Sequence, residues 1–252
     1  MDPFRELVKA AGEAIGRYDL ISEGDRILVG LSGGKDSYAL LHVLHHLRQK
    51  APVHFEVIAA TFDPGFSGFH AEKIAGSCRE RGWEHHTVSL NIPAILEEKK
   101  YTQTPCVLCS RLRRGKLYGL ARELGCGKLA LGQHFDDIAV SFLMSLFRGQ
   151  GLTTMGPNVP NQEGDLRIIR PLALADEEQI RAYTATLSLP SAGTCPFEEQ
   201  LESGDRAWFR RHLDELAERI PNLRSQMKRS LSNLQLEYLL DPRFCGKENP
   251  FK

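Results

Sequence analysis

The sequence lacks the features of a membrane-spanning or exported protein. No stretch of its 252 residues approaches about 18 consecutive apolar residues, so we expect no transmembrane helix. Residues 1–20 carry charged side chains such as Arg5, Lys9 and Glu13 and have no apolar core of the kind that a secretory signal needs. We therefore expect a cytoplasmic protein whose six cysteines are reduced thiols, metal ligands or catalytic groups rather than structural disulfides.

The sequence also has no net charge, because 32 Lys and Arg residues balance 32 Asp and Glu residues. Overall charge therefore gives no indication of a nucleic-acid partner. The charge is unevenly distributed, however. Residues 99–128 contain one acidic side chain, Glu123, against eight basic ones: Lys99, Lys100, Arg111, Arg113, Arg114, Lys116, Arg122 and Lys128. Such a segment is usually a solvated face, but a patch this one-sided can also bind phosphates.

Internal repeats and low-complexity tracts are absent as well, and the chain length suits one α/β domain with a small appendage. Short apolar runs predict strands at residues 26–31, 55–62, 84–90, 128–132 and 166–169. Apolar residues spaced three and four apart predict helices at residues 3–18, 36–48, 71–81, 110–124, 136–147 and 177–187. This alternation predicts an α/β fold, a doubly wound and mainly parallel sheet with helices on both faces and a helix at the N-terminus.

The alternation of predicted strands and helices ends after Pro190. Residues 191–204 are irregular and acidic, whereas residues 205–240 are almost continuously helical in pattern, with a break at Pro221. We therefore predict a catalytic domain at residues 1–190, followed by a loop and a C-terminal helical appendage at residues 191–252. Side chains of this appendage such as Trp208 and Arg210 fit contacts with a nucleic acid and an amphipathic packing helix equally well.

A glycine-rich turn between the first predicted strand and its helix has the sequence Ser-Gly-Gly-Lys-Asp-Ser. Its two glycines let the backbone approach an anion closely, and the amides at the helix N-terminus add donors for phosphate. The spacing is too short for the P-loop of the nucleoside triphosphatases, and resembles instead the PP-loop of the ATP pyrophosphatases. The alternative is a strand–helix turn with chance polar residues. The resemblance implies that Lys35 and Asp36 are catalytic and that ATP is bound by Ser32, Gly33, Gly34, Lys35, Asp36 and Ser37.

Further polar residues follow the second and fourth predicted strands, at the sheet edge where ligands bind in open α/β folds. Asp63 would hold the ribose or adenine of ATP, or cap a turn. Gly132 and His134 precede a helix, and His134 would contact phosphate. Asp136 and Asp137 would hold Mg²⁺, orient His134 or cap the helix. We assign Asp63, Gly132, His134 and Asp137 to the ATP site.

The cysteines form one C-x-x-C pair, Cys106 and Cys109, just before a predicted helix. Such a pair alone is compatible with zinc, redox chemistry or a cluster, and a structural zinc site usually has two pairs. Together with Cys195 it supplies three thiolates, which suits a [4Fe–4S] cluster with one open iron; a redox pair and zinc are the alternatives. The other cysteines are expected to be small buried side chains: Cys78, Cys126 and Cys245.

Four segments, residues 24–26, 105–115, 131–137 and 169–172, resemble the motifs of the tRNA 2-thiocytidine synthetases, a family of PP-loop ATP pyrophosphatases. The resemblance implies the PP-loop fold of the adenine nucleotide α-hydrolases and a [4Fe–4S] cluster held by Cys106, Cys109 and Cys195. It further implies that ATP and Mg²⁺ serve to adenylate the C2 oxygen of cytidine 32 of tRNA, after which sulfur displaces AMP. Two positions depart from the family pattern, because Gln133 replaces a usual histidine and Glu198 a frequent cysteine.

The same resemblance implies the partners of the protein. A group of basic residues would bind tRNA, or would instead pair with the acidic residues 176–178. The basic residues of this group are Arg111, Arg113, Arg114 and Lys116. A sulfur donor such as a cysteine desulfurase would supply the sulfur, and the size of tRNA suggests a homodimer that shares the surface. The alternatives are a PP-loop thiolase or ligase acting on another tRNA base or a small molecule, and a non-catalytic regulator that binds ATP or a cluster.

Overall fold

The protein is described by a computed structural model that covers residues 2–100, 105–193, 195–197 and 203–245. By compactness the chain divides into two units, Met1–His212 and Leu213–Lys252. The boundary at residue 190, drawn from the change in sequence pattern after Pro190, stays a prediction. Among the described residues, no helix is long and apolar enough to cross a membrane.

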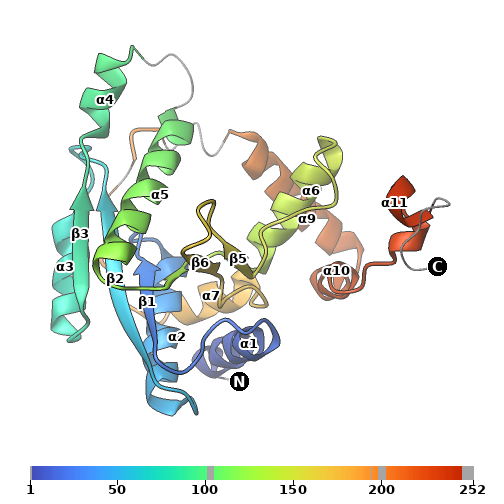
Figure 1. Ribbon diagram of the computed structural model, residues 1–252, viewed down its shortest axis with the longest axis horizontal. Helices are drawn as coiled ribbons and strands as arrows, with labels where there is room; N and C mark the ends of the chain where they lie inside the picture. The colour runs from blue at the N-terminus through green and yellow to red at the C-terminus, as the bar shows by residue number, and fades with distance from the viewer. Residues whose placement is uncertain (1, 101–104, 194, 198–202, 246–252) are drawn as a thin grey trace. The chain divides into compact units, whose positions relative to one another are not determined.

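The first unit is built on a six-stranded sheet with the order β3-β2-β1-β4-β6-β5 (Figure 1). The strands are β1 (Asp25–Gly30), β2 (Phe55–Asp63), β3 (His85–Ser89), β4 (Lys128–Ala130), β5 (Asn158–Pro160) and β6 (Arg167–Ile169). All neighbouring strands are parallel except β5, which pairs antiparallel with β6 at the edge. The predicted doubly wound, mainly parallel sheet is therefore confirmed.

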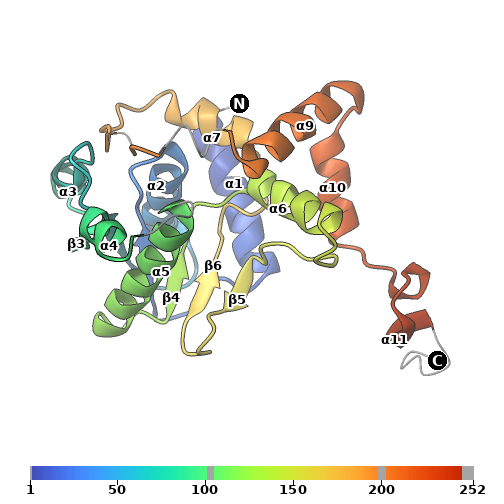
Figure 2. The ribbon, with the colours of Figure 1, turned by 90° about the horizontal axis from the view of Figure 1, so that it is seen from above.

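Helices cover both faces of this sheet (Figure 1 and Figure 2). One face packs against α1 (Pro3–Arg17), α2 (Lys35–Lys50), α3 (Ala71–Glu80) and α7 (Glu177–Thr184), and the other against α5 (Pro105–Glu123). The remaining helices of this unit are α4 (Ile92–Glu98) and α6 (Phe135–Phe147). Helix α9 (Asp205–Arg219) spans the boundary between the units, and the second unit contains α10 (Leu223–Leu231), η1 (Leu236–Tyr238) and α11 (Pro242–Cys245).

The side chains of the central strand β1 pack into the hydrophobic cores on both faces of the sheet. Ile27 and Val29 belong to the core shared with α1 and α2, whereas Leu28 belongs to the core under α5. All three side chains are fully buried, and each contributes about 1.5–3 kcal/mol relative to an exposed position. The carboxyl end of β1, from which the glycine-rich turn starts, is therefore anchored firmly.

Two short elements lie in segments for which no helix or strand was predicted. Helix α4 is capped by Asn91, whose Oδ1 accepts a hydrogen bond from the amide of Ala94 at 3.0 Å, and Pro93 occupies its first turn. Strand β5 is a three-residue edge strand, a place where Pro160 is tolerated because an edge strand needs fewer amide donors. Neither is long enough to produce a clear hydrophobic period.

The position of the C-x-x-C pair corrects one prediction. We expected the pair on a loop before a helix starting at residue 110, but α5 begins at Pro105, so both cysteines lie in its first two turns. A proline at the first helical position is favourable because its missing N–H would have no partner there. Residues 101–104 and Glu198 lie outside the described residues.

Candidate active site

The glycine-rich turn leaves β1 at Gly30 and enters α2 at Lys35. Gly33 has a φ of +86°, a conformation that side-chain-bearing residues rarely adopt. A Cβ atom there would also collide with Ala192 and lie 2.9 Å from Cδ1 of Ile74. Only glycine therefore fits this position.

Hydrogen bonds within the turn fix its shape. The hydroxyl of Ser37 donates to the carbonyl of Gly34 at 2.8 Å, and its Oγ accepts from the amide of Ser32 at 3.2 Å. The amide of Gly34 donates to Oγ of Ser32 at 3.3 Å. No side chain caps the start of α2, so the helix dipole and its first amides face an open turn. This is the arrangement that binds phosphate at helix N-termini.

A second loop packs directly against this helix start. A Cβ atom on Gly132, just after β4, would lie 2.9 Å from the carbonyl of Asp36 and from the amide nitrogen of Ser37. The absence of a side chain at this position lets the β4–α6 loop touch the backbone of α2. His134 is thereby brought beside Asp36.

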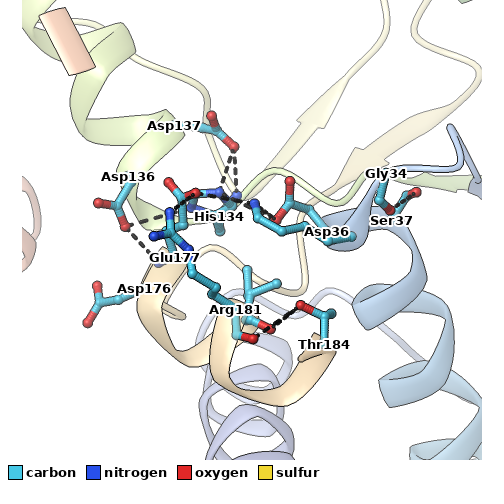
Figure 3. Close-up of polar contacts among 12 residues, drawn as sticks. Gly34, Asp36, Ser37, His134, Asp136, Asp137, Asp176, Glu177, Arg181 and Thr184 are labelled. Atoms are coloured by element: carbon cyan, nitrogen blue, oxygen red, sulfur yellow. Dashed lines mark hydrogen bonds and ion pairs between the residues drawn. The ribbon is translucent and has the colours of Figure 1, made fainter. Parts of the chain in front are cut away.

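His134 is the centre of a cluster of carboxylates (Figure 3). Its side chain is 2% exposed, and its Nε2 lies 3.9 Å from Oδ1 of Asp36 and 3.5 Å from Oδ2 of Asp137. Its Nδ1 lies 3.7 Å from Oδ2 of Asp136, which is fully buried. Asp136 also accepts a hydrogen bond from the first amide of α7, that of Glu177, at 2.9 Å.

Two of these carboxylates are candidate ligands for a magnesium ion. Asp36 and Asp137 come from the starts of two different helices and face the same nitrogen of His134. Mg²⁺ is commonly held by one or two carboxylates together with substrate phosphates and water, so a pair beside a phosphate-binding turn suits it. The predicted group of Asp36, His134 and Asp137 is therefore assembled in one place.

Lys35 points toward the same cluster. Its Nζ donates to Oδ1 of Asp36 at 2.8 Å and lies 3.3 Å from Oε1 of Glu177. Burial alone would lower the pKa of Lys35, but Asp36 and Glu177 outweigh it and raise that pKa above its usual value. Burial raises the pKa of Glu177, yet the cations Lys35, Arg181 and Arg210 together hold it below the usual range. Lys35 is thus a fixed positive charge beside the turn.

Sequence reasoning missed the contribution of Glu177 and of Arg210. Arg210 of α9 donates to Oε2 of Glu177 at 2.5 Å and to Oδ1 of Asp137 at 2.9 Å. Glu177 lies about 140 residues after the turn and Arg210 about 175, and only the packing of α7 and α9 brings them there. No local pattern in the sequence assigned either residue to this site.

The segment that carries Cys195 is tied to the same region. Ala192, which packs on Gly33, accepts a hydrogen bond from the amide of His70 at 2.8 Å, and Gly193 forms a bridge with Phe69. Ala192 therefore links the glycine-rich turn to the segment of the third predicted cysteine.

The three predicted cluster cysteines act on one another electrostatically. Burial and then Cys195 raise the pKa of the Cys106 thiol. Burial raises the pKa of the Cys109 thiol, against Arg113, with Cys195 and Cys106 adding to the rise. Three thiols that interact in this way are the predicted donor set of a [4Fe–4S] cluster, which spreads its ligands over several iron atoms. Within the described ranges, no three His, Cys, Asp or Glu residues are grouped closely enough to hold a single metal ion.

Comparison with known proteins agrees with this geometry. The model of a PP-loop domain family matches residues 5–190. A tRNA-cytidine(32) 2-sulfurtransferase of Syntrophotalea carbinolica is 41% identical over 94% of this chain and 92% of its own. A tRNA-cytidine(32) 2-sulfurtransferase of Geobacter sulfurreducens is 38% identical over 94% of this chain and 93% of its own. The chain belongs to the tRNA-cytidine(32) 2-sulfurtransferase family of PP-loop proteins.

A solved structure shares the fold of this family member. The U34-tRNA thiolase NcsA from Methanococcus maripaludis, determined with its [4Fe-4S] cluster, has a TM-score of 0.73 and 23% sequence identity. The match covers 93% of this chain and 80% of that one. At this identity the likeness supports the PP-loop fold alone.

Gln133, where the family resemblance led us to expect histidine, has a specific partner. Its Oε1 accepts a hydrogen bond from Nε of Arg170 at 2.5 Å, and a second guanidinium nitrogen donates to the carbonyl of Gly156. Burial lowers the pKa of Arg170. The amide of Gln133 is a neutral acceptor that stays compatible with this buried cation at every pH.

Asp63 ends β2 at the same sheet edge as the glycine-rich turn. Its Oδ1 accepts a hydrogen bond from the amide of Gly65 at 2.9 Å, which is the turn cap that we weighed as the alternative. A role of Asp63 in binding ATP stays a prediction.

The predicted tRNA-binding residues are all exposed on α5: Arg111, Arg113, Arg114 and Lys116. Within the described part of the chain they form no ion pair, and the expected alternative partner Glu177 pairs with Lys35, Arg181 and Arg210 instead. Arg113 lies near Cys109, on whose pKa it acts. The basic group is therefore open to solvent beside the cysteine pair. Cys78 and Cys126 are buried as expected, and the side chain of Cys245 lies outside the described residues.

Proposed function

We propose that the protein uses ATP to replace the C2 oxygen of cytidine 32 of tRNA with sulfur, forming 2-thiocytidine. One observation carries the proposal: within a member of the tRNA-cytidine(32) 2-sulfurtransferase family, Ala192 links the phosphate-binding turn to the segment that carries Cys195. Activation by ATP and delivery of sulfur can then occur next to each other.

The first half-reaction is activation of the base. The C2 oxygen of a pyrimidine leaves poorly, and its attack on the α-phosphate of ATP converts it into a phosphate ester while pyrophosphate leaves. Lys35 and the amides at the start of α2 stabilise the negative charge that develops on the phosphates. Asp36 and Asp137 would hold Mg²⁺, which would neutralise further phosphate charge.

The second half-reaction requires sulfur at the activated carbon. Cys106, Cys109 and Cys195 would hold the [4Fe–4S] cluster, which would supply an open iron able to bind a sulfur atom. A C–S bond forms at C2 and the C–O bond to AMP breaks. AMP leaves with the former base oxygen.

The partners follow from this reaction. We propose that Arg111, Arg113, Arg114 and Lys116 contact the tRNA backbone, because they are exposed cations on the helix that carries Cys106 and Cys109. A donor such as a cysteine desulfurase would supply sulfur, and a homodimer would share the tRNA surface. The proposed reaction places the protein in the cytoplasm, where tRNA is modified.

The test is mass analysis of nucleosides from tRNA of a strain that lacks the gene. We expect 2-thiocytidine to disappear and to return when the wild-type gene is restored. A Lys35→Ala gene should fail to restore it, whereas Lys50→Ala, an exposed change at the far end of α2, should restore it. Unchanged 2-thiocytidine in the deletion strain would refute the substrate.

A further inference from the structure

Arg210 reaches the ATP site from α9, far along the chain from the glycine-rich turn. Its guanidinium contacts three carboxylates: Glu177 at 2.5 Å, Asp137 at 2.9 Å and Asp136 at 3.9 Å. The side chain is 23% exposed, so these contacts are partly shielded from water. Charge-assisted hydrogen bonds of this kind, made by a planar fork to two carboxylates, are stronger and more directional than surface ion pairs.

Glu177 joins Arg210 to the glycine-rich turn. Its Oε1 faces Nζ of Lys35 at 3.3 Å while its Oε2 accepts from Arg210. The two cations therefore stand on opposite sides of one carboxylate. Lys35 is the lysine that the turn presents to phosphate, so the guanidinium lies a single carboxylate away from the phosphate-binding position.

The position of the Arg210 guanidinium matters because the surrounding cluster is rich in negative charge. Four carboxylates gather here, from Asp36, Asp136, Asp137 and Glu177, and the phosphates of ATP would add more negative charge. Lys35, Arg181 and Arg210 are the cations in direct contact with them at 3.0 Å or less. Without Arg210, Asp137 would keep only the more distant Arg206, at 3.4 Å, and the cluster would repel an incoming triphosphate more strongly.

We infer that Arg210 is a further residue of the ATP site, which rests on the proposed use of ATP. It holds Asp137 and Glu177 in place before ATP arrives. Asp137 would hold Mg²⁺ when ATP binds, and the N–H groups of Arg210 that it releases would then donate to phosphate oxygens. The carboxylate of Asp137 would thus exchange the guanidinium for Mg²⁺, and the phosphate oxygens would gain the guanidinium. Each negative group would keep a positive partner.

Calorimetric titration of the purified protein with a non-hydrolysable ATP analogue and Mg²⁺, without tRNA, tests this inference. We expect Arg210→Ala to weaken binding roughly tenfold or more, because a charge-assisted hydrogen bond is lost. The affinity of Arg210→Lys for the analogue should lie between those of the wild type and Arg210→Ala, because an ammonium keeps the charge but cannot span two carboxylates. A higher Mg²⁺ concentration should restore part of the affinity of Arg210→Ala, because Mg²⁺ can replace the lost positive charge. If Arg210 only supported the fold, added Mg²⁺ would not restore the affinity.

Arg211→Ala is the matched control. Arg211 is the next residue of α9, is exposed, and makes no ion pair with any residue that the structure describes. It should bind the analogue as the wild type does. Wild-type affinity in a folded Arg210→Ala protein would overturn the inference; if that variant does not fold, wild-type affinity in Arg210→Lys would do so.

The outcomes separate the inference from the proposed function. A wild-type protein that binds ATP but leaves cytidine 32 unmodified overturns the substrate alone, and the Arg210 variants still decide the role of Arg210. A wild-type protein that binds no ATP overturns both.

Discussion

Gly132 lies so close to Asp36 that a Cβ atom at position 132 would be 2.9 Å from the carbonyl oxygen of Asp36. This contact between the end of β4 and the start of α2 brings the two halves of the candidate ATP site together. It places His134, two residues after Gly132, beside the carboxylate of Asp36.

The contact predicts the effect of Gly132→Ala. The added methyl group meets backbone atoms, which cannot rotate away, so the start of α2 must shift at a cost of about 1–3 kcal/mol. We expect stability to fall by that amount and affinity for an ATP analogue to fall roughly tenfold or more, measured by urea unfolding and calorimetry. Gly127→Ala is the control, because a Cβ atom there meets nothing within 4 Å. Equal affinities in the two variants would show that the close approach does not shape the site.

A second prediction concerns the three cysteines. Replacing Cys195 by Ala removes one of three thiolates, so the visible absorbance of an iron–sulfur cluster should be strongly reduced in protein purified without oxygen. Cys126→Ala should keep it, because Cys126 is a buried residue of the core under α5. Zinc in place of iron, found by elemental analysis of the wild type, would contradict the cluster and favour the metal alternative.

The dependence of stability on pH is the third prediction. Burial lowers the pKa of His42 and of His45 to about 4 from the ordinary 6.5, and His45 also stacks on Trp83 with ring centres 4.6 Å apart. Below pH 6.5 the unfolded chain takes up protons that the folded protein excludes. Stability should therefore fall as the pH drops from about 6.5 to about 4, by on the order of 2–3 kcal/mol for the well-buried His45.

Urea unfolding across this pH range measures the effect. His45→Gln removes one titrating group, so its stability should depend less steeply on pH than that of the wild type. Gln49→Ala changes an exposed, uncharged residue of the same helix and should keep the wild-type slope. Identical slopes for His45→Gln and the wild type would contradict the assignment.

The site could be predicted from sequence where the signals were local. Strand, glycine pair and helix start adjoin in the chain, so the turn from Ser32 to Ser37 was predicted with its residues. His134 and Asp137 follow a strand that neighbours β1, and the shared carboxyl edge of parallel strands places them near Lys35.

The parts that were not predicted depend on contacts between distant segments. Glu177 and Arg210 lie on α7 and α9, and the sequence does not state how those helices pack. Ala192 is a small residue in an irregular segment, and its contact with Gly33 is visible only once both backbones are placed. The first turn of α5 was missed because its cysteines follow an irregular stretch and interrupt the apolar spacing.

Lys35 gives the last prediction. Because Asp36 and Glu177 raise its pKa, Lys35 stays charged throughout the neutral range and needs no proton uptake to meet phosphate. Lys35→Ala removes a charge aimed at the phosphates in the transition state, so pyrophosphate release in the presence of tRNA should fall by about 10²–10³-fold. Lys35→Arg should recover little, because the guanidinium is larger and its fork geometry differs from a point charge.

Pyrophosphate release is the measurement, with tRNA thiolation followed in parallel. Lys50→Ala, at the exposed C-terminal end of α2, should turn over as the wild type does. If Lys35→Ala lowers pyrophosphate release and thiolation by the same factor, activation by ATP limits both. Undiminished pyrophosphate release in Lys35→Ala would remove Lys35 from the adenylation step, because no other lysine in the described part of the chain contacts this carboxylate cluster.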